Sequence, residues 1–159
     1  MSVQTLAGQT IGQYELRELY GSGGLGAVYR AYQRILEREE AFKVLSNEMM
    51  TDDDYIKRFY QEAKTAAALE HPHIVPVYDY GTVGDINFVP MRLLTGGSLN
   101  ERLKQRVNEY VSLGEAVDLL KQLASALDYA HSKNVIHRDI KSNNIMFDNH
   151  GSAYLVDFG

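Results

Sequence analysis

The sequence predicts an α+β fold, with a strand-rich first part that contains one helix and a helical second part. β-Branched and aromatic residues are frequent in residues 14–45, and an amphipathic helical pattern occupies about residues 51–70. A glycine pair at positions 96 and 97 then precedes two further helical stretches. With 159 residues, 45% of them hydrophobic and 23% charged, the chain has the size and composition of one ordinary domain.

The strand-rich part begins after a polar stretch, residues 1–13, that we expect to be an N-terminal tail. Two breaks separate the strands expected in residues 14–45. One is the glycine-rich stretch YGSGGLGA at residues 20–27, and the other is a charged turn predicted at residues 37–40.

The first helix is predicted to begin at Thr51 as its N-cap. Three aspartates follow Thr51 directly, where the helix dipole favours negative charge. The helix should end near Glu70, before the sequence HPH. Short apolar strands are expected next, at residues 74–80 and 86–91.

The helical part opens with GGSL at residues 96–99, before a short helix. Ser112 and Glu115 form a capping-box pattern for a second long helix, and Asn134 can end that helix in a left-handed conformation. The apolar stripe predicted for this helix consists of Ala116, Leu119, Leu120, Leu123, Leu127 and Ala130.

Composition excludes several classes of protein. A net charge of −5 argues against a general nucleic-acid binder, which normally carries a basic surface. The chain has no cysteine, so disulfides and thiolate metal sites are excluded and a reducing compartment is expected. There is neither a signal-peptide pattern nor an apolar run of about 18 residues. We therefore expect a soluble, cytoplasmic domain.

The stretch GSGGLG fits the pattern G-x-G-x-x-G at Gly21, Gly23 and Gly26. Glycines let backbone N–H groups approach phosphate oxygens closely, although a flexible hairpin turn has the same composition. A dinucleotide-binding fold would need a helix after the glycines and a later acidic residue such as Glu40. The residues that follow, AVYRAY, are β-branched and aromatic, so strand–glycines–strand is favoured.

Lys43 lies inside the apolar strand AFKVL, where a lysine commonly points to solvent. The spacing of the first helix offers an alternative, because Glu62 falls on an otherwise apolar stripe. A carboxylate on that face is costly unless it is paired, and Lys43 is the nearest candidate cation. Glu62 could instead be the polar edge of a stripe formed by Tyr55, Phe59, Ala66 and Leu69.

The densest set of polar residues is in NVIHRDIKSNNIMF, which has apolar residues at both ends, unlike an ordinary solvated loop. A hairpin predicted after it would bring Asn144 beside Asp157, and two oxygen ligands of this kind suit Mg²⁺. Asp139 is close enough in sequence to accept a proton from an incoming hydroxyl, and Lys141 could neutralise phosphate charge.

In order along the chain, GSGGLGAV, AFK, QEAKTAAALEHPHIVPVYDYG, HRDIKSNN and DFG resemble the motifs of eukaryotic-like serine/threonine protein kinases of the bacterial type. This resemblance covers roughly residues 14–159. It implies a two-lobe α+β fold, with an antiparallel β N-lobe carrying one αC helix and the start of a mainly helical C-lobe. The implied divisions are a tail at 1–13, the N-lobe and hinge at 14–94, and a partial C-lobe at 95–159 that ends at DFG.

The resemblance implies ATP and Mg²⁺ as cofactors and protein serine or threonine hydroxyls as acceptors. Lys43 would hold the α- and β-phosphates and pair with Glu62, Asp139 would orient the hydroxyl, and Lys141 would face the transferring phosphate. Asn144 and Asp157 would bind magnesium. Met91 falls at the gatekeeper position, before a hinge at Arg92, Leu93 and Leu94. The implied nucleotide-binding residues are Tyr20, Gly21, Ser22, Gly23, Gly24, Leu25, Gly26, Ala27, Val28, Ala41, Lys43, Met91, Arg92 and Leu93.

Three positions depart from the family pattern. Glu40 replaces a common valine and, by alternation, should face away from Lys43. Pro90 removes a ladder donor just before the hinge, and Ser142 replaces a common proline. The activation loop, the peptide-binding segment and the large C-lobe helices of the family are expected beyond these 159 residues. The chain by itself should therefore be inactive. The alternative is a non-catalytic nucleotide-binding or pseudokinase-like module, against which the intact Lys43, Asp139, Asn144 and Asp157 argue.

Overall fold

The computed structural model of the chain describes residues 5–23, 26–46 and 49–158. The chain divides into one unit of residues 1–67 and 77–93 and a second unit of residues 68–76 and 94–159. The sequence-based division instead kept residues 68–76 and Leu94 in the first lobe. The structural reason for the difference is backbone pairing, because the N–H of Val75 donates to Leu155 O and the N–H of Leu155 donates to His73 O.

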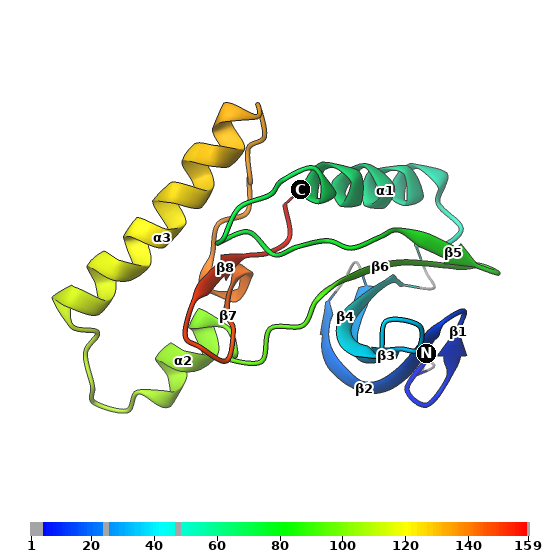
Figure 1. Cartoon of the computed structure of the whole chain (residues 1–159), viewed down its shortest axis with the longest axis horizontal. Coiled ribbons are helices and arrows are strands. Elements are labelled where there is room, and N and C mark those ends of the chain that lie inside the picture. Colours follow the sequence, from blue (N-terminus) through cyan, green and yellow to red (C-terminus); the bar gives the residue numbers. More distant parts are fainter. Residues whose placement is uncertain (1–4, 24–25, 47–48, 159) are drawn as a thin grey trace. The chain divides into compact units, whose positions relative to one another are not determined.

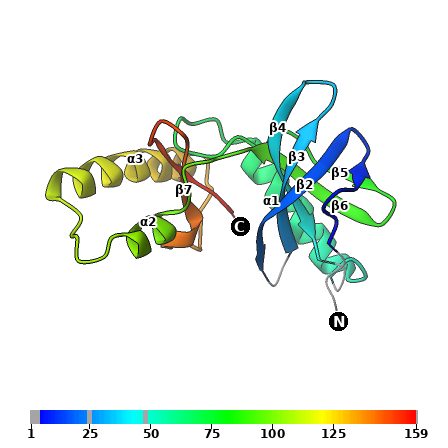
Figure 2. The same ribbon diagram turned by 90° about the horizontal axis from the view of Figure 1, so that it is seen from below.

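The first unit contains an antiparallel six-stranded sheet in the order β1-β2-β3-β4-β6-β5 (Figure 1). Strands β2, β3 and β4, which follow one another in the sequence, lie side by side in this sheet (Figure 2). The strands are β1 (Thr10–Ile11), β2 (Tyr14–Gly23), β3 (Gly26–Gln33), β4 (Arg38–Leu45), β5 (Gly81–Val83) and β6 (Ile86–Arg92).

One face of this sheet carries an aromatic core. The ring of Phe42 lies 4.9 Å from that of Tyr14 and 4.5 Å from that of Phe88, measured between centroids. Burial, followed by the charge of Glu40, raises the pKa of Tyr14 to about 12. The opposite face packs against α1 (Asp53–Ala67), where buried Phe59 joins the cluster of Leu45 and Val89.

Helix α1 differs from the prediction at both ends. Its N-cap is Asp52 rather than Thr51, because Oδ1 of Asp52 accepts a hydrogen bond of 2.9 Å from the N–H of Asp54. It ends at Ala67, three residues before Glu70, because the chain leaves it for the backbone pairing with Leu155 in the second unit. No helix in the described part of the chain is long and apolar enough to cross a lipid bilayer.

Two other local predictions were wrong. Residues 74–80 form isolated bridges at Ile74 and Val77 instead of a strand, since Pro76 between them has no N–H to donate. The turn predicted at residues 37–40 occupies residues 34–37, where Glu37 has a φ of 53°. Residues 38–40 are the start of β4.

Glu40 faces away from Lys43 as alternation predicted, yet it is buried in the sheet, with 1% of its surface exposed. Nε of Arg38 lies 2.6 Å from one Glu40 oxygen, whereas Oε2 has no hydrogen-bond partner among the described residues. The guanidinium of Arg38 also lies 3.9 Å from the centre of the Tyr78 ring. The carboxylate is therefore held by one partly exposed arginine.

Pro90 does not interrupt the pairing of β6 with β4. Its carbonyl accepts a hydrogen bond of 2.9 Å from the N–H of Tyr78. The N–H and C=O of one strand residue point to the same side, so the donor that proline lacks would also have faced Tyr78. The register Phe42↔Pro90 is consequently kept.

The second unit contains α2 (Leu99–Gln105), α3 (Leu113–Ser132), a short 3₁₀ helix, η1 (Ser142–Asn144), and the hairpin of β7 (Ile145–Phe147) with β8 (Ala153–Leu155), seen in Figure 1. The capping box of Ser112 and Glu115 is confirmed, as is the left-handed Asn134 with a φ of 61°. Leu120 is an exception on the predicted stripe, since it is exposed whereas Leu123 is buried.

Gly96 lies where the backbone approaches β7 closely. Its N–H donates to Phe147 O at 2.8 Å. A Cβ at this position would lie 2.4 Å from the carbonyl oxygen of Asp148. The close approach ties the segment after the hinge to the hairpin that leads towards Asp157.

Replacing Gly96 with alanine should therefore destabilise the chain by about 1–3 kcal/mol, as overpacking against rigid backbone does. Urea unfolding measures the change. Gly114→Ala is the matched control, because the nearest atom to an added Cβ is 4.0 Å away and alanine favours helix. Equal stability of the Gly96→Ala and Gly114→Ala proteins would contradict this prediction.

Candidate active site

The glycine-rich stretch joins β2 to β3, so the predicted order of strand, glycines and strand is confirmed. The glycines have different reasons for lacking a side chain. A Cβ on Gly26 would lie 2.0 Å from Val44 O. A Cβ on Gly21 or on Gly23 would have no other atom within 4 Å. The space beside Gly21 and Gly23 suits the backbone approach of a phosphate. Gly24 and Leu25 lie outside the described residues.

Three nucleotide-binding candidates on β3 and β4, Val28, Ala41 and Lys43, share one face of the sheet, whereas Ala27 is opposite Val44 and lies in the aromatic core on the other face. Val28 lies directly opposite Lys43, and Ala41 and Lys43 have the same orientation along β4. The remaining loop candidates are Ser22 opposite Ala27, and Tyr20, which is partly exposed on β2. The face of Val28, Ala41 and Lys43 therefore presents small or apolar side chains beside one lysine, and Arg30, opposite Ala41, borders it.

Lys43 and Glu62 are both half-buried. Nζ of Lys43 lies 5.9 Å from the centre of the Phe59 ring on α1. Glu62 follows Phe59 by three residues on α1 and lies at the edge of the buried stripe of Phe59, Ala63 and Ala66. The structure thus directs Lys43 to the turn of α1 that carries Glu62.

The hinge candidates lie at the end of β6. Met91 is opposite Ala41 and packs against the cluster that contains Phe59. Arg92 is opposite Glu40, on the other face of the sheet, and Leu93 follows directly. Met91 is therefore the hinge-proximal side chain that shares a face with Ala41 and Lys43.

In the second unit, His137 organises the catalytic-loop candidates. The N–H of Asp139 donates to Nδ1 of His137 at 3.2 Å, and Nε2 lies 2.7 Å from Val156 O. Because Nδ1 accepts a hydrogen bond from the Asp139 N–H and Nε2 must donate one to a carbonyl, these contacts require the neutral tautomer with its proton on Nε2. The ring is buried and packs 4.5 Å from the ring of Phe158.

Sequence reasoning gave His137 no role, although a histidine between apolar residues and Asp139 was a usable signal. The ring connects Asp139 to Val156, the residue before Asp157. It is a positioning residue, since it holds two predicted site segments together within one unit.

Asp139 is held by two neighbours. Nδ2 of Asn144 donates to the backbone carbonyl of Asp139 at 2.9 Å and to its carboxylate at 3.0 Å. Nζ of Lys141 lies 3.1 Å from the same carboxylate oxygen. The hydrogen bond from Lys141 is the largest influence that holds the pKa of Asp139 below its usual value. Asp139 is therefore a carboxylate at neutral pH.

The predicted neighbourhood of Asn144 and Asp157 is present in the backbone. The N–H of Val156 donates to Asn144 O at 3.1 Å, next to the register pair Ile145↔Leu155. Asp157 and Arg138 have φ values of 56° and 70°, a left-handed conformation that costs about 1–2 kcal/mol per residue. Strain of this kind is concentrated at functional sites.

The donor set in this region fits Mg²⁺. The amide nitrogen of Asn144 is directed to Asp139, so Oδ1 is the atom that Asn144 has for a cation, and Asp157 supplies carboxylate oxygens. Magnesium is commonly held by one or two such oxygens together with phosphate and water. Gly159, the last residue of the DFG motif, lies outside the described residues.

Comparison with known proteins identifies the class. Residues 14–159 match the protein kinase domain family, so the chain belongs to that family. It is 39% identical to serine/threonine-protein kinase PknE of Mycobacterium bovis over 99% of this chain, and 38% identical to PrkC of Bacillus subtilis over 93%. The chain spans 28% and 22% of the length of these two relatives.

The fold is a portion of the protein kinase fold. A solved variant of the Mycobacterium tuberculosis PknI kinase domain matches with a TM-score of 0.83 and 30% identity, covering 99% of this chain and 63% of that chain. Another PknI kinase domain structure gives a TM-score of 0.82 and 31% identity. The predicted antiparallel N-lobe with one helix, followed by the start of a helical C-lobe, is confirmed.

Lys141→Met should raise the pKa of Asp139 towards the ordinary value of about 3.9, because the largest cause of its depression is removed. On acidification, the Asp139 carboxylate of the variant would therefore be protonated at a higher pH than that of the parent chain. A ¹³C NMR titration of the aspartate carboxyls measures this.

The control for this titration is Lys133→Met, since Nζ of Lys133 lies 5.8 Å from the centre of the Tyr129 ring and does not influence Asp139. An Asp139 titration that is identical in the two variants would contradict the assignment of Lys141 as its partner.

Proposed function

We propose that this chain carries the nucleotide-binding and catalytic-loop residues of an ATP-dependent serine/threonine protein kinase. The reaction is transfer of the γ-phosphoryl group of Mg-ATP to a serine or threonine hydroxyl of a protein. The single observation that carries the proposal is the arrangement of Asp139, Lys141 and Asn144, with Asp139 also tied through His137 to Val156. The family membership of the chain supports the same reaction.

In this proposal the first unit binds the nucleotide. Backbone N–H groups beside Gly21 and Gly23 approach the phosphates, because no side chain occupies that space. Lys43 neutralises charge on the α- and β-phosphates, and its orientation towards α1 makes Glu62 its partner. Ala41 and Met91 offer an apolar surface to adenine on the same face of the sheet.

The second unit supplies the residues for transfer. Bound magnesium would be held by Asn144 and Asp157, and it would neutralise charge on the phosphate oxygens. Asp139 orients the acceptor hydroxyl and accepts its proton, for which it must be ionised. Its depressed pKa keeps it ionised at neutral pH. Lys141, 3.1 Å from Asp139, places a positive charge beside the transferring group.

The alternative is a non-catalytic module that binds nucleotide or a protein partner. Lys43, Asp139, Asn144 and Asp157 are all present, which favours catalytic descent over a pseudokinase. The absence of cysteine from the 159 residues supports a reducing, cytoplasmic location for this part of the chain.

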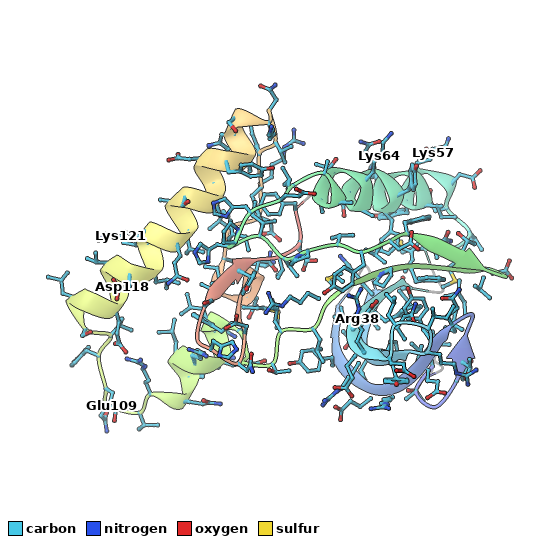
Figure 3. All side chains as sticks on the ribbon, viewed as in Figure 1. Arg38, Lys57, Lys64, Glu109, Asp118 and Lys121 are labelled. Atoms are coloured by element: carbon cyan, nitrogen blue, oxygen red, sulfur yellow. The ribbon has the colours of Figure 1, made fainter. Side chains whose placement is uncertain are left out.

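Lys43→Met should reduce the affinity of the chain for Mg-ATP by about tenfold or more, since a charge-assisted contact to phosphate is worth about 1.5–3 kcal/mol. Calorimetry with and without magnesium measures the affinity. Lys64→Met is the matched control, because Lys64 is exposed on the outer side of α1 (Figure 3). Binding that is equal in both variants would exclude the proposed role of Lys43.

The 159 residues alone are expected to transfer almost no phosphoryl group to protein substrates. They span 63% of the PknI kinase domain, and positioning of an acceptor contributes up to roughly 7–11 kcal/mol to such a reaction. Exposed Leu113 and Leu120 on α3 should also favour aggregation. An assay with radiolabelled ATP and generic serine/threonine substrates measures turnover.

Turnover by a monodisperse monomer that is lost in Asp139→Asn would show that the 159 residues suffice for catalysis. With a full-length relative of the chain, phosphate found chiefly on tyrosine would contradict the proposed acceptor class.

A further inference from the structure

Strand β2 contains a bulge directly before the glycine-rich stretch. Leu16 is opposite Ala31 and Leu19 is opposite Tyr29, so Arg17 and Glu18 together face the single residue Arg30. A second register shift follows between Leu19 and Gly21. A bulge leaves a residue unpaired and increases the local twist, so the backbone ladder holds this part of β2 weakly.

The bulged part of β2 also has a strand partner on one side only. Strand β1 pairs with Tyr14 and Glu15, and Leu16 makes the last backbone hydrogen bonds to the segment before it. From residue 17 to residue 23, β3 is the only strand paired with β2 in the described part of the chain. Side-chain contacts therefore have more influence on this stretch than they would in a central strand.

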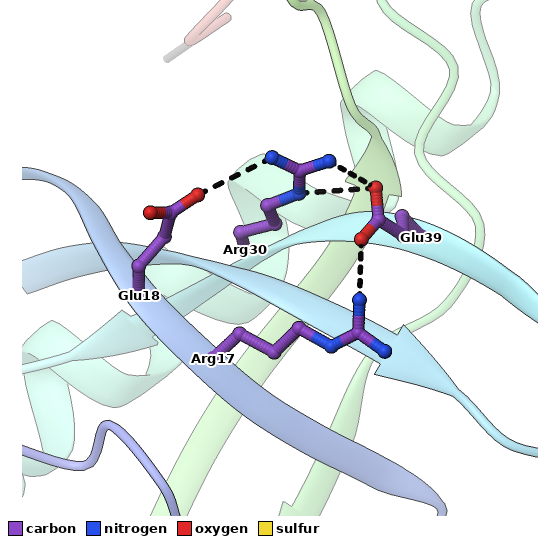
Figure 4. Close-up of polar contacts among 4 residues, drawn as sticks. All are labelled: Arg17, Glu18, Arg30 and Glu39. Atoms are coloured by element: carbon purple, nitrogen blue, oxygen red, sulfur yellow. Dashed lines mark hydrogen bonds and ion pairs between the residues drawn. The ribbon is translucent and has the colours of Figure 1, made fainter.

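Four charged side chains connect the bulge to the next two strands (Figure 4). Glu18 accepts a hydrogen bond of 3.3 Å from Arg30, whose guanidinium also donates through Nε, at 3.0 Å, and Nη2 to one oxygen of Glu39. The other oxygen of Glu39 accepts a bond of 2.7 Å from Arg17. The chain of contacts runs from β2 through β3 to β4 and back to β2. We call these four residues the bulge network.

The bulge network borders the surface that the proposed function assigns to the nucleotide. Arg30 is directly opposite Ala41, and Val28, two residues along β3 and on the same face, is opposite Lys43. None of the four residues of the bulge network belongs to the proposed nucleotide or metal site. They can affect the nucleotide only through the position of the strands that carry it.

We propose that the bulge network is a positioning element for the glycine-rich loop, holding β2 on β3 and β4 so that Gly21 and Gly23 are set for phosphate. The affinity part of this inference rests on the proposed function. The four side chains of the bulge network are between 29% and 62% exposed. Each ion pair therefore changes the equilibrium between the held and the released strand by a factor of only about 1.4 to 5. Glu39 joins both arginines, and its loss should have the largest effect.

The test compares Glu39→Gln with Glu15→Gln in the 159-residue chain. Both variants remove one carboxylate from the same sheet, and Glu15 pairs with Arg34 at 2.7 Å, before the bulge. Hydrogen exchange of peptides covering residues 16–23 is measured without nucleotide. Exchange should be about threefold or more faster in Glu39→Gln and unchanged in Glu15→Gln.

The second measurement is the dissociation constant for Mg-ATP. In about 0.1 M salt it should rise about threefold to tenfold in Glu39→Gln relative to Glu15→Gln. In about 1 M salt, where screening acts within about 3 Å, the two values should converge. Arg17→Gln should have a smaller effect, and adding it to Glu39→Gln should cause no further loss.

Exchange that is the same in both variants, or that rises equally, would overturn the positioning role. Faster exchange in Glu39→Gln with no change in nucleotide affinity would overturn the link to binding. A parent chain that binds no Mg-ATP would refute the proposed function, and the exchange result would still decide whether the bulge network holds the loop.

Discussion

The second unit depends on one buried hydrogen bond, from Nε2 of His137 to the carbonyl of Val156. Since the backbone N–H of Asp139 occupies Nδ1, both ring nitrogens are engaged and the ring cannot rotate without losing a partner. Phe158 packs on the ring and restricts access of water to it. The loop of Asp139 and the segment of Asp157 are thus held by the same neutral side chain, in a region where two residues have left-handed backbone.

In the first unit, one face of the sheet forms the core and the other carries candidate nucleotide-binding residues, because successive side chains of a strand point to opposite faces. Phe42 and Phe88 build a stacked aromatic core on one face, while Val28, Ala41 and Lys43 share the other. A charged residue is tolerated on the core face only with a partner, as the pairing of Glu40 with Arg38 shows. The face that carries Lys43 packs against α1 and is the face to which the nucleotide is proposed to bind.

Several sequence-based predictions that were correct concern short-range interactions, although the N-cap of α1 and the turn before β4, which are also local, were misplaced. The capping box of Ser112 and the left-handed Asn134 were correct because both are satisfied within one turn of chain. Residues 74–80 were misassigned because Pro76 divides them, so that the hydrogen bonds on its two sides go to different segments, Leu155 and Pro90. The exposure of Leu120 could not be inferred either, since periodicity shows which residues share a helix face but not how far that face is covered.

The sequence by itself determined the order of strands, glycines and helices, and the chemical groups available along them. The order of the elements follows from local propensity. The candidate site residues could be recognised because only a few reactions require these residue types together. The neighbourhood of Asn144 and Asp157 followed from the predicted hairpin, but the tertiary structure decided the other contacts between distant groups. A one-residue bulge in β2 placed Arg17 and Glu18 opposite Arg30, and the hairpin of β7 and β8 brought Val156 to His137. Register and long-range pairing set these contacts, because the energies that select them come from residues far apart in the chain.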